Sequence, residues 1–419
     1  MSLERYIDPD RALALVLEHT PPGRSVTVPL ADALGLTLAE EIRADRDFPP
    51  FDRAMMDGYA VNVRDAGLVV EVVAAASAGT GSPTAVAEGR AVEIMTGAPC
   101  PPGTQAVVMR EEIRPAARTA AAPSSEDAAA WPPLAAGRKV LLPPAVETDQ
   151  YVTRRGSECQ AGSVALPIGT TVTAIPIGII AACGRTTVKV LGRPSLAVVV
   201  TGDEIVRPGE TRRPEQIHDS NGPMLAAAAR LVGLTETEIS VSWAADSLEA
   251  LEQTIDSTAS TDVLILSGGV SAGRHDLVPQ ALERCGATIV FHKVAQKPGK
   301  PLLFARRGGQ VVFGLPGNPV SGHMCFHRYV VPALHRMMGR PPIKRQSHGV
   351  LCAPLTISSE RALFVPAVAE ESTTVRLRPL PHRSSADILA VAPANAYLRL
   401  PPGQHDLAAG QTVSFEWSH

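Results

Sequence analysis

The chain has 419 residues, too many for one hydrophobic core of usual size, so two to four domains are expected. Its 39 basic and 42 acidic residues give a formal net charge of −3, which provides no overall positive field to attract nucleic acid or an anionic membrane. Aromatic residues make up only 4% of the chain, which also argues against base-stacking surfaces for nucleic acid.

The sequence indicates a cytoplasmic protein with no membrane span. Its start, MSLERYIDPDRALALVLEH, lacks the basic region and the long apolar core of a signal peptide. No uninterrupted apolar run reaches the ~18 residues of a transmembrane helix. The cysteines are dispersed, without a C-x-x-C pair, as is typical of reduced thiols. They are Cys100, Cys159, Cys183, Cys285, Cys325 and Cys352.

In chain order, the first part is expected to be mostly β-structure. Residues 9–19 have the apolar spacing of a helix, with Asp10 placed to cap it. A short strand and an amphipathic helix are predicted over residues 26–44. Short strands follow over 59–63 and 69–112, and again from about residue 140 to 190. Residues 114–138, biased toward Ala, Pro and Ser, are interpreted as a flexible surface insertion.

From residue 193 the pattern changes to alternating apolar strands and helices, which is typical of a doubly wound parallel sheet. Strands are expected at 196–200, 262–269, 288–293 and 311–313, and helices at 220–233, 246–256, 277–286 and 320–338. The final segment, 345–419, reads as short strands with Pro/Gly turns and predicts a small β-barrel or sandwich.

These patterns define four segments of an α/β multidomain protein. They are a discontinuous N-terminal linker domain (1–47 plus 151–192), a β-rich inserted domain (48–150), an α/β domain (193–340) and a C-terminal β-barrel (345–419).

Four strands of the α/β domain each run into a polar or glycine-rich loop. The loops are TGDE (201–204), SGGVSAGRHD (267–276), AQKPGKP (295–301) and GLPGNPVSG (314–322). Each loop alone could be an ordinary turn. Ligands bind outside the carboxyl ends of such strands, so the convergence of four loops on one edge favours a binding pocket.

The residue types in these loops suit an anion held with a metal ion. Backbone N–H groups around Gly268, Gly269, Gly273 and Gly317 can approach an anion, as can the start of the helix after Pro319. Two lysines, Lys297 and Lys300, add charges that suit phosphate or another oxyanion. Three carboxylates, Glu204, Asp262 and Asp276, supply the hard oxygens that Mg²⁺ prefers. In the alternative interpretation, Asp276 only caps the helix that follows it.

Other chemistries have little support in the sequence. It contains no Walker A motif and no G-x-G-x-x-G after a strand, so NAD binding is not indicated. The histidines show no close grouping for zinc, and no Ser/His/Asp set can be selected. Two N-terminal motifs, MMDGYA (55–60) and IMTGAP (94–99), stay open between ordinary turns and parts of a site.

Eight motifs, in order, resemble the molybdopterin molybdenumtransferase family, which includes the carboxy-terminal catalytic domain of gephyrin. They cover nearly the whole chain and are FDRAMMDGYA, IMTGAPCPPGTQAVVMREE, VTGDEIV, QIHDSNGPML, SGGVSAGRHD, QKPGKP, FGLPGNPVSG and SSADILAVAPANAYLRLPPG.

The resemblance implies an enzyme of molybdenum cofactor biosynthesis. Family members insert molybdenum from molybdate into adenylylated molybdopterin and release AMP in a Mg²⁺-dependent step. The resemblance also implies an elongated homodimer, whose cleft lies between the α/β domain and the partner's MDGYA domain. Contacts with molybdopterin adenylyltransferase or with acceptor molybdoenzymes are further expectations. No nucleic acid or membrane is expected as a partner.

The expected site residues combine the loop chemistry with this resemblance. Catalytic roles fall on Asp57, Glu204 and Asp276, and metal binding falls on Glu204, Asp262 and Asp276. Substrate or anion binding falls on Thr96, Ser267, Gly268, Gly269, Ser271, Lys297, Lys300, Gly317, Asn318 and Ser321.

The sequence also departs from the family pattern. Arg53 and Ala54 stand where Asn and Ser are usual, Ser157-Glu158 replaces an acidic pair, and Pro366 stands where Arg is frequent. Two alternatives therefore remain beside the insertase. One is a molybdopterin-binding scaffold or carrier with weak chemistry. The other is the pathway's ATP-using adenylyltransferase, against which the additional domains argue.

Overall fold

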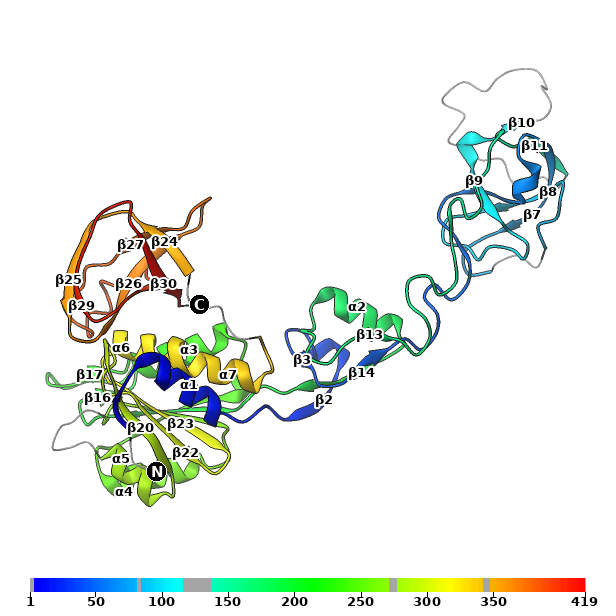
Figure 1. Cartoon of the computed structure of the whole chain (residues 1–419). Helices are drawn as coiled ribbons and strands as arrows, with labels where there is room; N and C mark the ends of the chain where they lie inside the picture. Colours follow the sequence, from blue (N-terminus) through cyan, green and yellow to red (C-terminus); the bar gives the residue numbers. More distant parts are fainter. Residues whose placement is uncertain (1–3, 81–83, 116–136, 271–276, 342–346, 419) are drawn as a thin grey trace. The chain divides into compact units, whose positions relative to one another are not determined.

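The computed structural model describes residues 4–80, 84–115, 137–270, 277–341 and 347–418 (Figure 1). The chain divides into two compact units. The first comprises residues 1–39, 169–173 and 187–419, and the second comprises residues 40–168 and 174–186. Within the described ranges, no helix is long and apolar enough to cross a membrane.

A seven-stranded sheet forms the centre of the first unit. Its order is β1-β20-β22-β23-β19-β15-β18, and every strand is parallel to the others except β22. The strands are β1 (Glu4–Ile7), β15 (Leu196–Thr201), β18 (Ile239–Ala244), β19 (Val263–Ser267), β20 (Thr288–Val294), β22 (Leu303–Arg307) and β23 (Gln310–Leu315). The predicted doubly wound sheet is therefore confirmed, with one antiparallel strand that the sequence pattern did not show.

Helices cover both faces of this sheet (Figure 1). Along β15, Val198 packs with the cluster under α1, α3, α6 and α7, whereas its neighbour Val199 packs with the cluster under α4 and α5. This alternation explains why the strand is apolar at every position. The helices are α1 (Pro9–His19), α3 (Asn221–Leu231), α4 (Leu248–Ser257), α5 (Val278–Arg284), α6 (Pro319–Cys325) and α7 (Val331–Met337).

Three features of this unit differ from expectation. The first helix is capped by Asp8, whose carboxylate accepts from the backbone N–H of Asp10 and Arg11, so the role given to Asp10 was wrong. Strand β1 pairs with β20 of the large sheet, and helix α1 packs against one face of that sheet. Both therefore lie in the first unit and not in the expected N-terminal linker domain. The helix predicted over 320–338 is interrupted by a π-helical turn, Phe326–Val330.

The segment predicted as strand plus helix, 26–44, forms only short strands and one 3₁₀ turn. Strands β2 (Ser25–Pro29) and β3 (Thr37–Leu38) pair with β14 (Thr187–Leu191) in the first unit, and the turn is Leu30–Asp32. Exposed residues interrupt the apolar face that the helix was expected to have. In addition, Gly35 adopts φ +76°, which an α-helix does not accommodate. Strand pairing replaces the amphipathic helix.

The C-terminal segment is a closed five-stranded barrel, as predicted. Its strands run β26-β27-β24-β30-β28, and β28 returns to pair with β26. A short strand of the α/β domain, β21 (Gln296–Lys297), joins β26 at the edge. The elements are β24 (Ser347–Leu351), β26 (Ala362–Glu370), β27 (Arg376–Pro379), β28 (Ala396–Leu400) and β30 (Thr412–Trp417), with a separate hairpin of β25 (Leu355–Ser359) and β29 (Gly403–Leu407).

The second unit is mainly β-structure, as expected, with one helix that the sequence analysis missed. A six-stranded sheet has the order β10-β11-β7-β8-β6-β9, and two small pairs are β12-β5 and β13-β4. The elements are β4 (Ile42–Arg43), β5 (Arg53–Ala54), β6 (Gly58–Val61), β7 (Val69–Ala76), β8 (Arg90–Ile94), β9 (Ala106–Met109), β10 (Arg114–Pro115), β11 (Arg138–Leu141), β12 (Val152–Thr153), β13 (Val164–Leu166) and α2 (Ala174–Ala182). Most of the predicted insertion, 114–138, lies outside the described residues.

Candidate functional site

A cavity of about 1010 Å³ opens at the carboxyl ends of the parallel strands. Its walls include residues from the loops after β15, β19, β20 and β23, so the predicted convergence of four loops is confirmed. The barrel supplies a further wall from residues 357–365 and 382–388. The sequence analysis did not anticipate this contribution.

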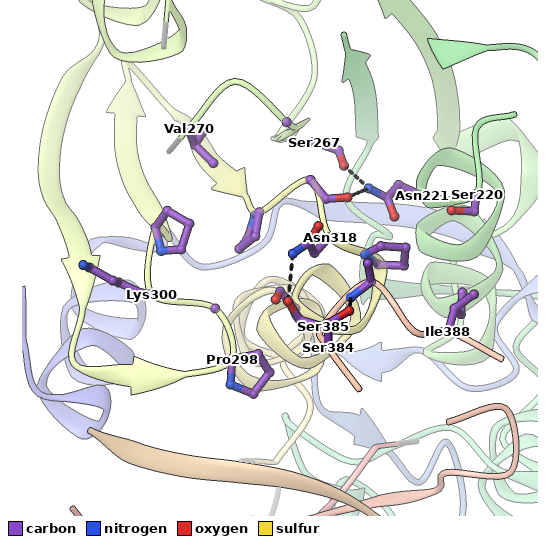
Figure 2. Close-up of a pocket in the computed structure, with 18 of the residues that line it drawn as sticks. Ser220, Asn221, Ser267, Val270, Pro298, Lys300, Asn318, Ser384, Ser385 and Ile388 are labelled. Carbon is purple, nitrogen blue, oxygen red and sulfur yellow. Dashed lines mark hydrogen bonds between the residues drawn. The ribbon is translucent and has the colours of Figure 1, made fainter. Parts of the chain in front are cut away.

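The start of helix α3 is bonded to two of the converging loops (Figure 2). The Asn221 side chain, 8% exposed, donates from Nδ2 to Ser267 Oγ at 2.9 Å and to the Gly317 carbonyl at 2.7 Å. A strand β16 (Ile205–Val206) and its partner β17 (Ile217–His218) lead the chain from β15 to this helix. Asn221 thus fixes the spacing between the loops that carry the expected residues Ser267 and Gly317.

Glycine is needed where the loop after β19 approaches β15. Gly268 has φ +101°, and a Cβ there would lie 2.7 Å from the Thr201 carbonyl oxygen. Gly269 has φ +63°, and its Cβ would lie 2.9 Å from a methyl group of Val278. Both residues line the cavity, so this close packing leaves their backbone at its wall.

The loop after β20, which carries Lys297 and Lys300, is held in place by the side chain of a buried glutamine. Gln296 donates from Nε2 to the Gly299 carbonyl at 3.1 Å and accepts from the Tyr329 hydroxyl at 2.5 Å. Gly299 has φ +88°, and a Cβ there would lie 2.6 Å from Cys325 Sγ. The exposed side chains of Lys297 and Lys300 project from this hydrogen-bonded turn and line the cavity.

The barrel attaches to the cavity at the start of α6. Asn318 donates from Nδ2 to Ser385 Oγ at 2.8 Å, and Val320 N donates to the Ser385 carbonyl at 3.1 Å (Figure 2). Ser321 is buried in the first turn of the same helix and also lines the cavity. The loop 382–388 therefore closes one side of the site through direct hydrogen bonds.

A partly buried histidine lies on α6 behind this attachment. His323 Nδ1 lies 2.7 Å from the Tyr397 hydroxyl of β28, and its ring is 4.4 Å from that of His327. Burial lowers the pKa of His323 to about 4 and raises the pKa of Tyr397. Both groups are therefore neutral near pH 7, and they join helix and barrel without a charge.

The carboxylates predicted to share a metal ion do not gather as expected. Glu204 lines the cavity, with its side chain close to Gly202. Asp262 precedes β19 at the opposite end of that strand, where it accepts from Ser195 N and Oγ at 2.9 Å each. Its assignment beside Glu204 is therefore corrected, because Asp262 connects the starts of β15 and β19 at the amino edge of the sheet.

Two expected residues, Ser271 and Asp276, lie outside the described residues. The helix that follows them, α5, begins at Val278 with Leu277 at the N-cap position. The alternative role of Asp276 as the cap of this helix remains a prediction. Its metal role remains a prediction.

The two other expected residues, Asp57 and Thr96, contact each other in the second unit. Thr96 donates to Asp57 Oδ1 from its backbone N–H at 2.6 Å and from its hydroxyl at 2.7 Å. The backbone bond, then the hydroxyl bond, lowers the pKa of Asp57. The two motifs left open as turns or site thus form one hydrogen-bonded pair with a stabilised carboxylate.

Two departures from the family pattern also meet in this unit. Arg53 Nη2 lies 3.1 Å from Glu158 Oε1, and both side chains are about half exposed. The arginine at the usual asparagine position therefore has its partner in the altered 156–159 loop.

Sequence reasoning missed several residues of the cavity wall. Asn221 and Ser385 occur in motifs quoted for their resemblance, so their signal was present but was not translated into a role. Asp246 and Arg361 also line the cavity. They lie outside the four loops, and only the fold brings them there.

Three parts of the chain match family descriptions. They are the MoeA N-terminal region (domain I and II) over residues 7–184, a probable molybdopterin binding domain over residues 197–336, and the MoeA C-terminal region (domain IV) over residues 349–417.

Full-length relatives agree with these matches. A molybdopterin molybdenumtransferase of Staphylococcus aureus (strain Mu50) is 30% identical over 398 residues, which cover 93% of this chain and 90% of that protein. One from Synechocystis is 29% identical and covers 96% of this chain and 98% of its own. The crystal structure of the molybdopterin biosynthesis MoeA protein from Pyrococcus horikosii superposes with a TM-score of 0.82 at 27% identity, covering 99% of both chains. The chain belongs to the molybdopterin molybdenumtransferase (MoeA) family.

Proposed function

We propose that this protein inserts molybdenum from molybdate into adenylylated molybdopterin and releases AMP. The observation that carries the proposal is the cavity at the carboxyl ends of the strands, where backbone donors, two lysines and the acidic residues Glu204, Asp219 and Asp246 line one space. Such a set suits a substrate that combines a nucleotide phosphate with an oxyanion.

Each part of the wall has a separate task in this proposal. The glycine loop at Gly268 and Gly269 lets the substrate phosphate approach the backbone, and Ser267 and Asn318 add polar contacts. Lys297 and Lys300 hold the oxyanion by charge. The barrel loop around Ser385 shields the reacting groups from water.

Magnesium fits the described donors only with help from the substrate. No group of three or more His, Cys, Asp or Glu side chains in the described ranges could hold a metal ion. Mg²⁺ often uses one or two carboxylates and completes its shell with substrate phosphate and water. Glu204 can supply one such oxygen, and Asp276 is proposed to supply another. When bound, the ion would neutralise phosphate charge.

The test of Asp276 is its change to Asn across a Mg²⁺ titration of AMP release. Asn keeps the size and one neutral oxygen but loses the charge on which hard cations depend, so turnover should fall and require more Mg²⁺. Wild-type turnover with the same Mg²⁺ midpoint would remove Asp276 from the metal site.

The decisive experiment for the function is AMP release from adenylylated molybdopterin with and without molybdate. An insertase should release AMP at a rate that rises with molybdate concentration. A scaffold would bind the nucleotide and release no AMP at any molybdate concentration, which would refute the proposal.

We further propose a cytoplasmic homodimer in which the Asp57–Thr96 pair of one copy serves the cavity of the other. Mixing tests this arrangement directly. Asp57→Asn and Lys297→Met should each be inactive alone, and their mixed dimers should recover part of the activity. No recovery in mixtures shown to have exchanged subunits would contradict it. Contacts with the adenylyltransferase or acceptor molybdoenzymes remain proposals.

A further inference from the structure

The segment between β15 and α3 forms one side of the cavity wall. We call residues 202–218 the flap, whose two ends are joined by the parallel pair of β16 with β17. Glu204 lines the cavity together with Ile205, Ile217 and His218. The carbonyl of Glu204 accepts from Ile217 N at 2.8 Å. The place of the Glu204 carboxylate at the cavity therefore depends on the place of the flap.

Two contacts join the flap to β18, the edge strand of the seven-stranded sheet. Asp246, which follows β18, donates from its backbone N–H to Asp203 Oδ1 at 3.1 Å. The Arg207 guanidinium lies over the indole ring of Trp243 on β18, with its Cζ 4.6 Å from the ring centroid. The flap is thus held against this edge of the sheet by a hydrogen bond and a cation–π contact.

The indole ring that receives Arg207 has a fixed place. Trp243 packs, partly buried, against the apolar cluster under α3, and its Nε1–H donates to Asp219 Oδ2 at 3.1 Å. Asp219 Oδ1 accepts from Gly222 N at 3.0 Å in the first turn of α3. A Cβ on Gly222 would lie 2.4 Å from Asp219 Oδ2 and 2.9 Å from a methyl group of Val241, so this turn packs tightly against β18.

The ion pair of Arg207 does not hold the flap to β18. Its partner Glu210 belongs to the flap itself, the two groups are 4.0 Å apart, and both side chains are more than half exposed, so the pair adds little. A cation over an indole ring is attracted by the ring quadrupole, and at an exposed site this attraction shifts an equilibrium by about two- to fivefold. Such a contact is too weak to determine the fold, but it changes how much of the time the flap stays on β18.

We propose that Arg207 and Trp243 are positioning residues, whose cation–π contact holds the flap on β18 and thereby keeps Glu204 at the cavity. Both side chains are described, and neither is part of the cavity wall, so they act through the flap. The inference rests on the proposed function only for the role of Glu204 toward Mg²⁺. The placement of the flap follows from the contacts of Asp203, Arg207 and Trp243.

Hydrogen–deuterium exchange of the full-length protein tests this placement without turnover. The Asp246 amide donates to the flap, and the Ile217 amide donates within it, so both are protected while the flap stays on β18. Arg207→Gln should raise amide exchange in residues 203–219 and at Asp246 about two- to fivefold. Arg207→Lys keeps a cation for the ring and should restore part of the protection.

A matched control lies on the same flap. Arg213→Gln removes the same charge from an exposed arginine, whose partner is Glu215 of the flap at 2.9 Å, and should exchange as the wild type does. Trp243→Leu removes the ring. Combined with Arg207→Gln, it should exchange no faster than Trp243→Leu alone, because one contact can be lost only once. Thermal unfolding shows whether each variant is folded, and the exposed Arg207 carries the test alone if Trp243→Leu is not.

The Mg²⁺ dependence of AMP release gives a second readout. Arg207→Gln should raise the Mg²⁺ concentration at half-maximal rate about two- to fivefold, because Glu204 spends less time at the cavity. The rate at saturating Mg²⁺ should stay near the wild-type value. A contact that only supports the fold would not move the Mg²⁺ midpoint.

Each part of the inference can be overturned separately. Unchanged exchange in Arg207→Gln, an equal rise in Arg213→Gln, or full additivity of Arg207→Gln with Trp243→Leu would show that the cation–π contact does not hold the flap. Raised exchange with an unchanged Mg²⁺ midpoint would overturn the positioning of Glu204. A wild type that releases no AMP would refute the insertase proposal, and the exchange rates would still decide whether Arg207 and Trp243 place the flap.

Discussion

Arg328 and Glu416 form an ion pair in the interior, between the π-helical turn after α6 and the last strand of the barrel. Their side chains are 2% and 7% exposed, and Arg328 also contacts Asp10 of α1 at 2.7 Å. Arg399 of β28 pairs with the same Asp10. One buried guanidinium thus joins the N-terminal helix, the α/β domain and the barrel.

We expect Arg328→Met to destabilise the first unit by about 3–5 kcal/mol, because Glu416 would remain buried as an unpaired charge. The double change Arg328→Met with Glu416→Leu should recover much of this loss. The urea midpoint measures both effects. Arg399→Met is the control, since its partner Asp10 is 59% exposed, and it should cost less than about 1 kcal/mol. A single Arg328→Met loss no larger than that of the control would show that the pair is not critical.

Thr201 should respond to substitution unlike buried threonines whose hydroxyl groups are hydrogen-bonded. Its hydroxyl has no hydrogen-bond partner among the described residues, although the residue is only 5% exposed. Thr201→Val removes a polar atom without leaving a lost partner, so stability should be unchanged or slightly higher. Thr258→Val breaks the bond from Thr258 Oγ1 to the Ile255 carbonyl, which is 2.7 Å long, and should cost about 1 kcal/mol. Equal losses in urea unfolding would contradict the prediction.

The ionisation of Asp57 should depend on the Thr96 hydroxyl. Its pKa is lowered by the backbone bond and then by the hydroxyl bond from Thr96, so the carboxylate stabilises the fold above its usual pKa near 3.8. This contribution is lost as the pH falls through the lower, folded pKa. Thr96→Val should move the pKa of Asp57 upward, while Thr96→Ser should leave it near the wild-type value. Carbon NMR titration of the Asp57 carboxyl group measures this, and identical pKa values in all three proteins would exclude the hydroxyl bond.

Low pH should reduce the free energy of unfolding of the first unit, because protonation of His323 is unfavourable in the folded state. Burial lowers the pKa of this imidazole from 6.5 to about 4, so the unfolded chain takes up the proton first. The stabilisation is therefore complete above pH 6.5 and is lost between pH 6.5 and 4, by on the order of 3 kcal/mol. His323→Gln should lack this portion of the pH dependence. Urea midpoints across this range measure it, and parallel curves for variant and wild type would show that His323 does not titrate abnormally.

The sequence patterns predicted most of the α/β domain because its strands are continuously apolar and end in glycine-rich loops. They failed where tertiary pairing outweighed local preference, as in residues 26–44, where an apparent amphipathic helix forms short strands. Strand β22 was missed because its antiparallel return lies between two parallel neighbours and leaves no periodic signal.

The candidate site was predictable to the same degree. Gly268, Lys297 and Asn318 follow strands that the sequence reveals, so their meeting could be expected. Asp262 was misplaced because a carboxylate just before a strand was grouped with those just after it, although the strand separates the two ends. Arg361 could not be found, since only the pairing of β21 with β26 brings the barrel to the lysine loop.

The pairing of β1 with β20 also has a consequence for how the chain is made. Glu4 leaves the ribosome before the second unit is made, and its register partner Phe291 is synthesised only after the whole of that unit. Until then the apolar side of α1, with Ala12, Leu15 and Val16, has no sheet to cover it. Residues 40–168 make most of their contacts among themselves and can fold before β1 has its partner strand β20. The nascent chain should therefore carry this apolar segment uncovered until β20 is made, a surface suited to chaperone binding.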